Sequence, residues 1–272
     1  MRIPEYDPNW PASWRLSHHY DLLEVGLPEV GGSETDRAYS ASYRVRRHHT
    51  LALVQAVAAT GARILDVAAA QGNFTLAPAE RGHDMTWNDL RVELAGYVEL
   101  KRERGEVRYR PGNIFELEDE PYDVVLATEV IEHVTYLDVL LDRLRELTRP
   151  GGHVVLTTPN GGYLRNPLPR FSDIPVPAEY EAMQYQPDAS GHLWLLDESE
   201  LTGLATAVGP TVSTTAYFTS PLTAGWLGLG PVTRRVTRAA LALGETAFGR
   251  LPLTIRRRLA THLAMLLEHT SP

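Results

Sequence analysis

The segment TEVIEHV at residues 128–134 brings together three side chains that could do chemistry. Carboxylates and imidazoles are groups with which proteins commonly move protons and bind divalent ions. If a helix begins here, Glu129, Glu132 and His133 stand at positions i, i+3 and i+4 and share one face of a turn. Two carboxylates at that spacing repel each other. The segment therefore predicts that a positive group lies between them.

The elements that must position this turn follow an alternating order. Short apolar runs that suit buried strands alternate with helical segments such as LRVELAGYVELKRERG, and TVSTTAYFTS is a further expected strand. This alternation predicts an α/β fold whose mainly parallel sheet is covered by helices on both faces. The turn follows the fourth run, at the carboxyl edge of the sheet, where such folds bind ligands. The runs lie at residues 63–68, 84–89, 107–113, 122–128 and 153–159.

The first strand–loop–helix unit, RILDVAAAQGNFT, has the form of a nucleotide-binding turn. Gly72 closes the loop and a helix is expected near Asn73, so backbone N–H groups and a helix N-terminus could approach a ligand. Asp89 lies 17 residues past Gly72, where a carboxylate could accept hydrogen bonds from ribose hydroxyls. Because alanines occupy residues 68–70, where glycines would be expected, an ordinary tight turn is the alternative.

The order of these motifs resembles that of the class I S-adenosylmethionine-dependent methyltransferases over about residues 50–218. LDVAAAQG is similar to the family's first motif, Leu-Asp-Val-Gly-Cys-Gly-x-Gly, and WND carries the acidic ribose-binding position. PGNIFEL is similar to the end of the third strand, and YDVVLATEVIEHV and RPGGHVVLTTPN resemble the fourth and fifth strands. The resemblance implies a Rossmann-like sheet of seven strands with a late antiparallel hairpin.

The same resemblance implies S-adenosylmethionine as the cofactor and indicates which residues contact it. Asn113 stands where the family commonly has an Asp facing adenine, and its amide oxygen could still accept a hydrogen bond. Tyr43 and Arg47 are secondary candidates for the methionine carboxylate, although a solvent-exposed place is the alternative for Arg47. The expected cofactor contacts are Asp66, Ala68, Gly72, Asp89, Asn113 and Ile114.

A second histidine, His192, follows 59 residues after His133. This layout resembles the small-RNA 3′-terminal 2′-O-methyltransferases and the ubiquinone-pathway O-methyltransferases, in which it implies Mg²⁺ or Mn²⁺ bound to a diol or catechol. The metal ligands would be Glu129, Glu132, His133 and His192. In the metal-free alternative His133 or His192 is the base and Glu132 orients it. A purely structural turn is the third interpretation.

The composition limits the class of protein. Hydrophobic residues make up 43% of the 272 residues and charged residues 22%, as in ordinary soluble globular proteins. The absence of cysteine excludes disulfides and thiolate chemistry. The first residues interrupt any signal-peptide pattern, and no run of about eighteen apolar residues could span a bilayer. We therefore expect a cytoplasmic protein.

The charge is unevenly distributed along the chain. A net charge of −8 argues against nucleic acid as the main partner. Residues 220–272 nevertheless hold seven arginines and two acids, which leaves −13 on the remainder. Near its end this segment predicts an amphipathic helix that packs on its own domain or on the second subunit of a homodimer, the alternative being peripheral contact with an anionic membrane or substrate. The apolar stripe is formed by Ile255, Leu259, Leu263, Leu266 and Leu267.

Three regions are expected. Residues 1–32 lack a sustained period and are predicted to form an irregular N-terminal arm or lid. Residues 33–219 form the methyltransferase domain, which opens with a helix capped by Ser33 and contains a proline-rich substrate lid at residues 160–190. Residues 220–272 form a C-terminal helical appendage.

The leading functional hypothesis is methyl transfer to a hydroxyl of a small molecule, such as a sugar or a glycosylated or polyketide-type natural product. Aromatic lid residues could enclose such a ligand. An RNA 3′-terminal 2′-O-methyltransferase is the alternative, which the spacing of His192 favours and the acidity of residues 1–219 opposes. A non-methylating binding protein on the same fold is the third. The lid aromatics are Tyr163, Phe171, Tyr180 and Tyr185.

Overall fold

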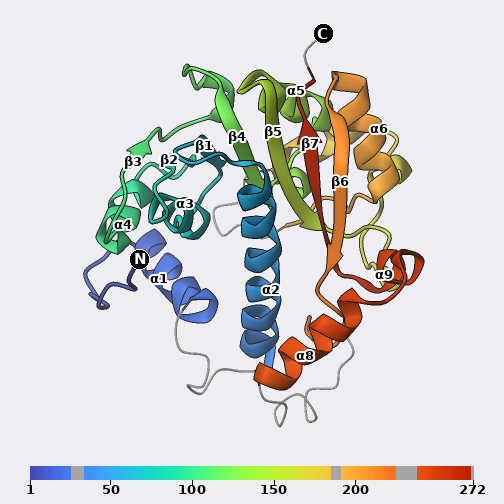
Figure 1. The fold of residues 1–272 in the computed structure, drawn as a ribbon, viewed down its shortest axis with the longest axis horizontal. Helices are drawn as coiled ribbons and strands as arrows, with labels where there is room; N and C mark the ends of the chain where they lie inside the picture. Colours follow the sequence, from blue (N-terminus) through green and yellow to red (C-terminus); the bar gives the residue numbers. More distant parts are fainter. Residues whose placement is uncertain (26–33, 185–190, 225–237, 271–272) are drawn as a thin grey trace.

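The computed structural model describes residues 1–25, 34–184, 191–224 and 238–270 (Figure 1). Within them, seven strands form one sheet in the order β3-β2-β1-β4-β5-β7-β6, in which β7 alone runs antiparallel to its neighbours β5 and β6. The predicted mainly parallel sheet with a late antiparallel hairpin is confirmed. The strands are β1 Arg63–Val67, β2 Asp84–Asn88, β3 Val107–Tyr109, β4 Tyr122–Thr128, β5 Thr148–Pro159, β6 Thr211–Phe218 and β7 His262–Glu268.

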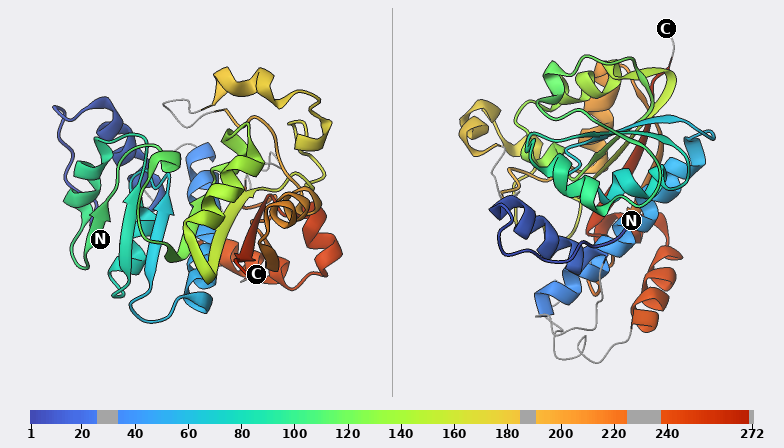
Figure 2. Two further views of the ribbon diagram at one scale, coloured as in Figure 1. Left: turned by 90° about the horizontal axis from the view of Figure 1, so that it is seen from above. Right: turned by 90° about the vertical axis from the view of Figure 1, so that its left-hand side faces the viewer.

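Helices cover both faces of the sheet (Figure 2). In β1, Leu65 packs into the core that α5 and α6 close, whereas Ile64 packs on the opposite face into the core of α2 and α3. Strands buried on both faces read as continuous apolar runs, which is why the sequence revealed them. The helices are α1 Ala12–Glu24, α2 Glu34–Val57, α3 Asn73–Ala79, α4 Leu94–Lys101, α5 Leu137–Glu146, α6 Glu198–Val208, α8 Arg238–Gly249 and α9 Leu253–Leu259.

The register of the parallel strands brings their carboxyl ends to one edge. Val67 of β1 pairs with Ala127 of β4, and Thr128 pairs with Thr157 of β5. The loops that follow β1, β2 and β4 therefore begin side by side, and this edge faces downward in Figure 1. No helix in the described part of the chain combines the length and hydropathy that crossing a bilayer demands.

The C-terminal segment is not purely helical, so the prediction of a helical appendage is wrong for its end. The helix α9 stops at Leu259, where the Asn160 side-chain amide donates hydrogen bonds to the carbonyls of Arg257 and Ala260 at 2.9 and 2.8 Å. The chain then becomes β7, which lies between β5 and β6 inside the sheet. The leucine run suits a helix and a fully buried strand equally well, because periodicity cannot separate the two.

The N-terminal region contains a regular helix, α1, so the prediction of an irregular arm is also wrong. Its buried face carries polar side chains instead of an apolar stripe, and therefore no hydrophobic period marks it in the sequence. The expected N-cap at Ser33 lies outside the described residues, and α2 begins at Glu34. The buried polar residues of α1 are Ser17, His18, Asp21 and Glu24.

The helix expected to begin at Glu129 starts later. Glu129 has a left-handed backbone with φ of 55°, residues Ile131–His133 form a single 3₁₀ turn, and α5 begins at Leu137. A left-handed residue cannot continue a right-handed helix. The side chains of Glu129 and Glu132 consequently point to different surroundings and do not share a helical face.

A candidate active site at the carboxyl edge of the sheet

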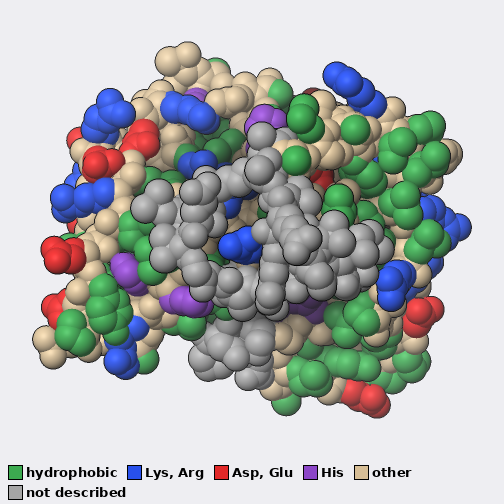
Figure 3. Space-filling view, turned by 90° about the horizontal axis from the view of Figure 1, so that it is seen from below, with side chains coloured by type: hydrophobic (Ala, Val, Ile, Leu, Met, Phe, Trp, Pro, Cys, Tyr) green, Lys and Arg blue, Asp and Glu red, His purple; other side chains and the backbone are tan. Residues whose placement is uncertain are grey.

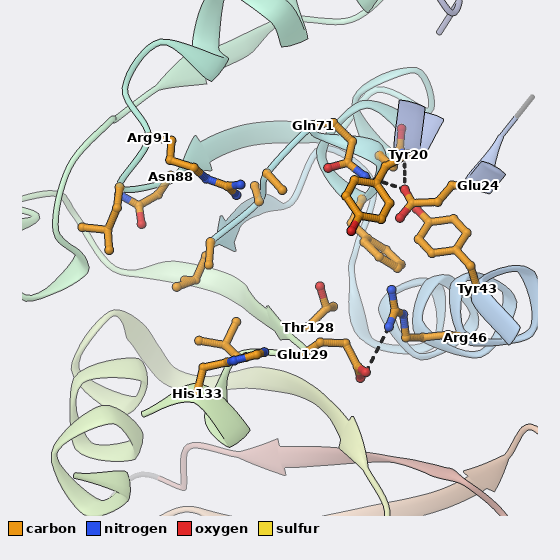
Figure 4. Close-up of a pocket in the computed structure, with 18 of the residues that line it drawn as sticks. Tyr20, Glu24, Tyr43, Arg46, Gln71, Asn88, Arg91, Thr128, Glu129 and His133 are labelled. Atoms are coloured by element: carbon orange, nitrogen blue, oxygen red, sulfur yellow. Dashed lines mark hydrogen bonds and ion pairs between the residues drawn. The ribbon is translucent and has the colours of Figure 1, made fainter. Parts of the chain in front are cut away.

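A cavity of about 850 Å³ opens at the carboxyl ends of β1, β2 and β4. Ligand pockets commonly measure about 300 to 1,000 Å³, so this one has the size for a ligand pair. Its wall comes from α1, α2 and the loops after those strands. Figure 3 shows this face of the molecule, with Lys or Arg side chains visible near its centre. Figure 4 shows the labelled residues projecting into the cavity from three sides.

The loop after β1 keeps the backbone shape of a glycine turn although it contains alanines. Ala68, Ala70 and Gly72 all have left-handed backbones, with φ of 52°, 46° and 73°. The carboxylate of Asp89 accepts a hydrogen bond from the Ala70 N–H at 2.8 Å, and the Trp87 indole donates to the Ala70 carbonyl at 3.0 Å. Tertiary contacts thus hold a conformation that costs about 1 to 2 kcal/mol for each alanine.

Asp66 lies beneath this loop and does not line the cavity. Its side chain is fully buried, and one carboxyl oxygen accepts a hydrogen bond from the Thr75 hydroxyl at 2.6 Å. The other oxygen has no partner among the described residues. Burial, aided by the nearby charge of Asp89, raises the pKa of Asp66 to about 7, although the bond from Thr75 opposes the shift. Asp66 therefore supports the loop from below.

The second end of the cavity is formed by residues after β2 and β3. Asn113 and Ile114, two of the predicted cofactor contacts, line it together with Asn88 and Arg91. The Asn113 side chain already accepts a hydrogen bond from the Phe115 N–H at 3.1 Å. The side chains of Asn88, Asn113 and Arg91 thus bring nitrogen and oxygen atoms that can form hydrogen bonds to the edge where such folds bind their ligands.

The six predicted cofactor residues therefore divide into two groups. Ala68 joins Asn113 and Ile114 in the cavity wall. The others lie behind that wall. The Asp89 carboxylate accepts hydrogen bonds from the Ala70 N–H of the loop at 2.8 Å and from the Arg91 guanidinium at 2.9 Å. Gly72 is the N-cap of α3 and lies against the Val98 side chain.

The positive group beside the crowded turn is Arg46 of α2. Its guanidinium lies 3.0 Å from a carboxylate oxygen of Glu129, whose other oxygen accepts a hydrogen bond from the Thr157 hydroxyl at 3.0 Å. The His262 imidazole lies 3.5 Å from the first oxygen. Burial would raise the pKa of Glu129, but Arg46 and His262 outweigh it and hold that pKa below its ordinary value. Glu129 is thus an ionised carboxylate that is already paired.

Glu132, His133 and His192 come together beside this pair, and their donor atoms all lie within 4.8 Å of one another. The Glu132 carboxyl is buried and accepts one hydrogen bond, from Thr158 at 3.0 Å, and its other oxygen has no partner among the described residues. Burial and the charge of Glu129 raise the pKa of Glu132 well above its usual range. The predicted grouping is found for three of its four members, because Glu129 is engaged elsewhere.

Both histidines of this group line the cavity and are neutral near pH 7. Burial, with a further contribution from the neighbouring His192, lowers the pKa of His133, and burial also lowers that of His192. The Nδ1 atom of His133 lies 3.2 Å from the carbonyl oxygen of Gly191. A carbonyl only accepts, so Nδ1 carries the proton in the neutral ring and Nε2 is free to take one.

Several cavity residues escaped the sequence-based prediction. Glu24 and Tyr39 come from the two N-terminal helices, and His262 comes from β7. Tyr43 and Arg46 line the cavity, whereas Arg47, the neighbouring candidate, is not part of the wall. Neighbouring positions on a helix point about 100° apart, and the sequence does not fix the rotation of α2.

The aromatic residues of the predicted lid do not line the cavity. Tyr163 is buried, and the rings of Phe171 and Tyr180 pack on Trp194 at 5.2 and 5.4 Å between centroids. Tyr185 lies outside the described residues. The described part of the 160–190 loop contains two 3₁₀ turns, Phe171–Asp173 and Pro177–Met183, from which Phe171 and Tyr180 pack against the core.

A buried polar network joins α1 to the end of the loop after β1. The Lys101 ammonium group, 1% exposed, donates to Asp21, to the Asn73 side chain and to the Gln71 carbonyl, each at 2.7 Å. Tyr97 donates to the second oxygen of Asp21 at 2.8 Å. Burial lowers the pKa of Lys101 despite the opposing charge of Asp21. The N-terminal helix is therefore part of the domain and closes one side of the cavity.

Comparison with known proteins accords with this geometry. The family described as "Methyltransferase domain" matches residues 38–214, more than half of the chain. The chain belongs to the class I S-adenosylmethionine-dependent methyltransferase family. The segment matched runs from α2 to β6 and so includes the loop after β1 and the Glu132 group of this methyltransferase.

Two relatives and one solved structure illustrate what the methyltransferase is similar to. It is 30% identical over 152 residues to the ubiquinone biosynthesis O-methyltransferase of Dechloromonas aromatica, covering 54% of this chain and 63% of that protein. The namesake from Azorhizobium caulinodans is 33% identical over 138 residues, 49% and 52% of the two chains. The methyltransferase thus matches less than two thirds of each relative's length. Magnesium protoporphyrin IX methyltransferase from Synechocystis PCC 6803, solved with bound SAH, shares the fold with a TM-score of 0.54 at 12% identity, over 95% of this chain and 93% of that one.

Proposed function

We propose that this methyltransferase transfers a methyl group from S-adenosylmethionine to a hydroxyl oxygen of a small molecule, with His133 as the base. The observation that carries the proposal is the neutral His133 imidazole in the cavity wall, whose Nδ1 faces the Gly191 carbonyl. The curated relatives are named as O-methyltransferases, which supports oxygen as the acceptor atom. A sugar or polyketide-type acceptor has no support from the lid aromatics, so the proposal names the hydroxyl alone.

S-adenosylmethionine, when bound, supplies an electrophilic methyl group on a positively charged sulfur. Methyl transfer to a hydroxyl requires that the oxygen lose its proton as it forms the new bond to carbon while the carbon–sulfur bond breaks. The Nε2 atom of His133 takes that proton, and the Gly191 carbonyl stabilises the imidazolium through Nδ1–H. His192 lies with its ring centroid 4.9 Å from that of His133 and helps to orient the acceptor. The rest of the rate enhancement comes from alignment of the hydroxyl oxygen with the methyl carbon and the sulfur.

A divalent ion such as Mg²⁺ or Mn²⁺ is a second candidate feature of this site. The residues fit such an ion, because a buried oxygen of Glu132 has no partner among the described residues and two imidazoles lie beside it. Glu132, His133 and His192 would hold the ion, which would stabilise a developing alkoxide. Glu129 is left out of this set because Arg46 and Thr157 occupy its oxygens.

The test is turnover of chelator-treated protein with S-adenosylmethionine and a panel of phenols, catechols and vicinal diols, followed by mass spectrometry of S-adenosylhomocysteine. His133→Ala should lower kcat by about 100-fold or more while leaving the cofactor Kd unchanged. His153→Gln, which changes a histidine outside the cavity, is the matched control and should keep full activity.

Metal dependence separates the two forms of the proposal. If the ion is bound, titration calorimetry with Mn²⁺ should show a binding isotherm that Glu132→Gln abolishes. If no ion is used, the chelator-treated protein should keep its full turnover. Unchanged turnover in both His133→Ala and His192→Ala would contradict a role for either histidine as base. Turnover confined to RNA 3′ ends would favour the RNA methyltransferase alternative instead.

A further inference from the structure

A long insertion separates β6 and β7 in the chain, although the two strands are neighbours in the sheet. β6 ends at Phe218 and β7 begins at His262, so the insertion comprises residues 219–261. The structure describes it except for residues 225–237. Antiparallel neighbours need a loop of only about 2 to 5 residues, and the matched methyltransferase segment ends at residue 214. Neither the sheet nor the family match therefore accounts for this part of the chain.

The insertion lies beside the cavity at both of its ends. Ala224, near its start, and His262, which directly follows its end, line the cavity wall. In Figure 1, α8 lies at the lower end of the molecule with α9 to its right, and the parallel strands end toward the same side. A partner bound to the exposed side of the insertion would therefore lie close to the cavity.

Large apolar side chains are exposed on the insertion. Leu243 of α8 is 70% exposed, more than any other large hydrophobic side chain in the described ranges. Leu251 is exposed in the turn before α9, and Leu253 and Ile255 are exposed in the first turn of that helix. No residue of α9 is fully buried, so the helix faces outward along most of its length. Apolar side chains gathered in this way commonly mark an interaction surface.

The same surface is basic. The insertion holds seven arginines and one acid, Glu245, in a chain whose net charge is −8. Glu245 is half-buried and accepts a hydrogen bond from the Ser220 N–H at 2.8 Å, so it is engaged within the domain. Arg250 and Arg258 are exposed and form no ion pair with a described residue. We call the following residues the insertion surface: Leu243, Arg250, Leu251, Leu253, Ile255 and Arg258.

We propose that the insertion surface binds an anionic lipid bilayer. Its leucines and isoleucine enter the boundary between headgroups and acyl chains, while its arginines contact the headgroups, as in segments that lie in the plane of a membrane interface. An anionic bilayer repels the acidic remainder of the chain, so the molecule binds in one orientation, with the insertion toward the lipid. The contact is peripheral, because no helix in the described part of the chain is long and apolar enough to cross a membrane.

Two other partners fit the same residues less well. A second copy of the chain would bring the arginines of both subunits together in a two-fold contact, and the insertion surface contains no acid that could pair with them. A protein partner usually presents charges of both signs. The insertion surface presents only positive ones, which match the uniform negative charge of an anionic bilayer.

The first experiment measures sedimentation of the protein with vesicles of phosphatidylcholine, alone or with about 30% phosphatidylglycerol. The wild-type protein should bind the anionic vesicles about tenfold or more tightly than the neutral ones, and salt at about 0.5 M should remove most of the difference. Arg250→Glu with Arg258→Glu should weaken binding to the anionic vesicles by about thirtyfold or more.

A matched control separates the insertion surface from net charge. Arg81→Glu with Arg104→Glu changes the charge equally, at exposed positions outside the insertion, and should weaken binding by less than about threefold. Thermal unfolding of both variants checks that the fold is kept, which is expected because all four side chains are exposed.

The second experiment locates the contact with a fluorescent label. The chain has no cysteine, so a single introduced cysteine can be labelled alone. A bimane label at Leu243→Cys or Leu253→Cys should shift its emission to shorter wavelengths on anionic vesicles, because it enters an apolar environment. The same label at Val139→Cys, an exposed apolar position on α5, should show no shift.

Every other outcome counts against the proposal. If the wild-type protein does not bind anionic vesicles, the proposal fails. Equal losses in the two charge-reversed variants would reduce binding to net charge, and a shift confined to the Val139 label would assign the contact to another face. Tighter binding to soluble polyglutamate than to vesicles would assign the surface to an acidic protein, and dimers that Leu243→Gln with Leu253→Gln abolishes would assign it to a second copy. No measurement uses turnover, so the result is independent of the proposed function.

Discussion

Asp66 has a carboxyl group that is buried beneath the loop after β1, and its environment makes stability depend on pH. Burial raises its pKa to about 7, against an ordinary value of 3.8. The folded protein therefore holds a proton there that the unfolded chain releases between about pH 4 and pH 7. The free energy of unfolding contributed by this group is fully present below that window and is lost as the pH rises through it.

We expect Asp66→Asn to remove this dependence. The difference in free energy of unfolding, variant minus wild type, should be about 2 kcal/mol or more higher at pH 8 than at pH 4.5. Each unit of pKa shift corresponds to about 1.4 kcal/mol. Urea unfolding of the cofactor-free proteins at both pH values measures the difference. Parallel pH profiles for the two proteins would show that Asp66 ionises normally.

The loop after β1 yields a prediction of opposite signs at two neighbouring positions. A Cβ added at Gly72 would lie 2.7 Å from a methyl carbon of Val98, and the residue has a φ of 73°. Gly72→Ala should therefore destabilise the protein by about 2 kcal/mol or more, of which about 1 to 2 is backbone strain. Ala70→Gly removes the strain of a left-handed alanine but makes the unfolded chain more flexible. The free energy of unfolding should therefore rise by between zero and about 1 kcal/mol.

Thermal unfolding without cofactor checks both changes. Adding Gly72→Ala to a Val98→Ala protein should cost less than adding it to wild type, because the contact is gone and only the backbone part of the loss remains. Val98→Ala alone is the reference, since this buried side chain has a truncation cost of its own. A Gly72→Ala protein as stable as wild type would contradict the strained conformation of the loop.

At the scale of elements, β7 is the strand that completes the sheet. Ala264 is fully buried and pairs with Thr157 of β5 on one side and with Ala216 of β6 on the other. Proline removes a ladder hydrogen bond and is not tolerated in a central strand. Ala264→Pro should therefore abolish cooperative unfolding of the whole domain, as followed by circular dichroism. Thr270→Pro, just beyond the strand, is the control and should cost far less.

The sequence predicted those elements whose burial leaves a clear pattern. The strand Tyr122–Thr128 was recognisable because both of its faces are apolar, and α5 because leucines repeat on one face. The helix α1 was missed because it buries acids and a histidine, and β7 because leucines suit either structure. The site was predictable where residues follow strand ends, as at His133, and unpredictable where a helix rotation decides, as at Arg46.

At the scale of the whole molecule, one buried ion pair joins segments 80 residues apart. Lys101 and Asp21 are both almost fully buried. Lys101→Met leaves the Asp21 carboxylate without its cation and should cost about 3 to 5 kcal/mol. Adding Asp21→Asn should recover at least half of that loss, because no uncompensated charge remains. Urea unfolding of the four proteins of this cycle gives the coupling energy, and strictly additive losses would contradict a direct pair.

The position of β7 also bears on how the chain acquires its fold as it is synthesised. Strand β6 is complete at Phe218, yet it has no neighbour in the sheet until His262–Glu268 has been made and has entered between it and β5. Before that moment the edges of β5 and β6 both present unpaired backbone groups, which are prone to pair with other chains. The nascent polypeptide thus depends on a late, long-range closure, and chaperones that shield exposed strands should matter most during that interval.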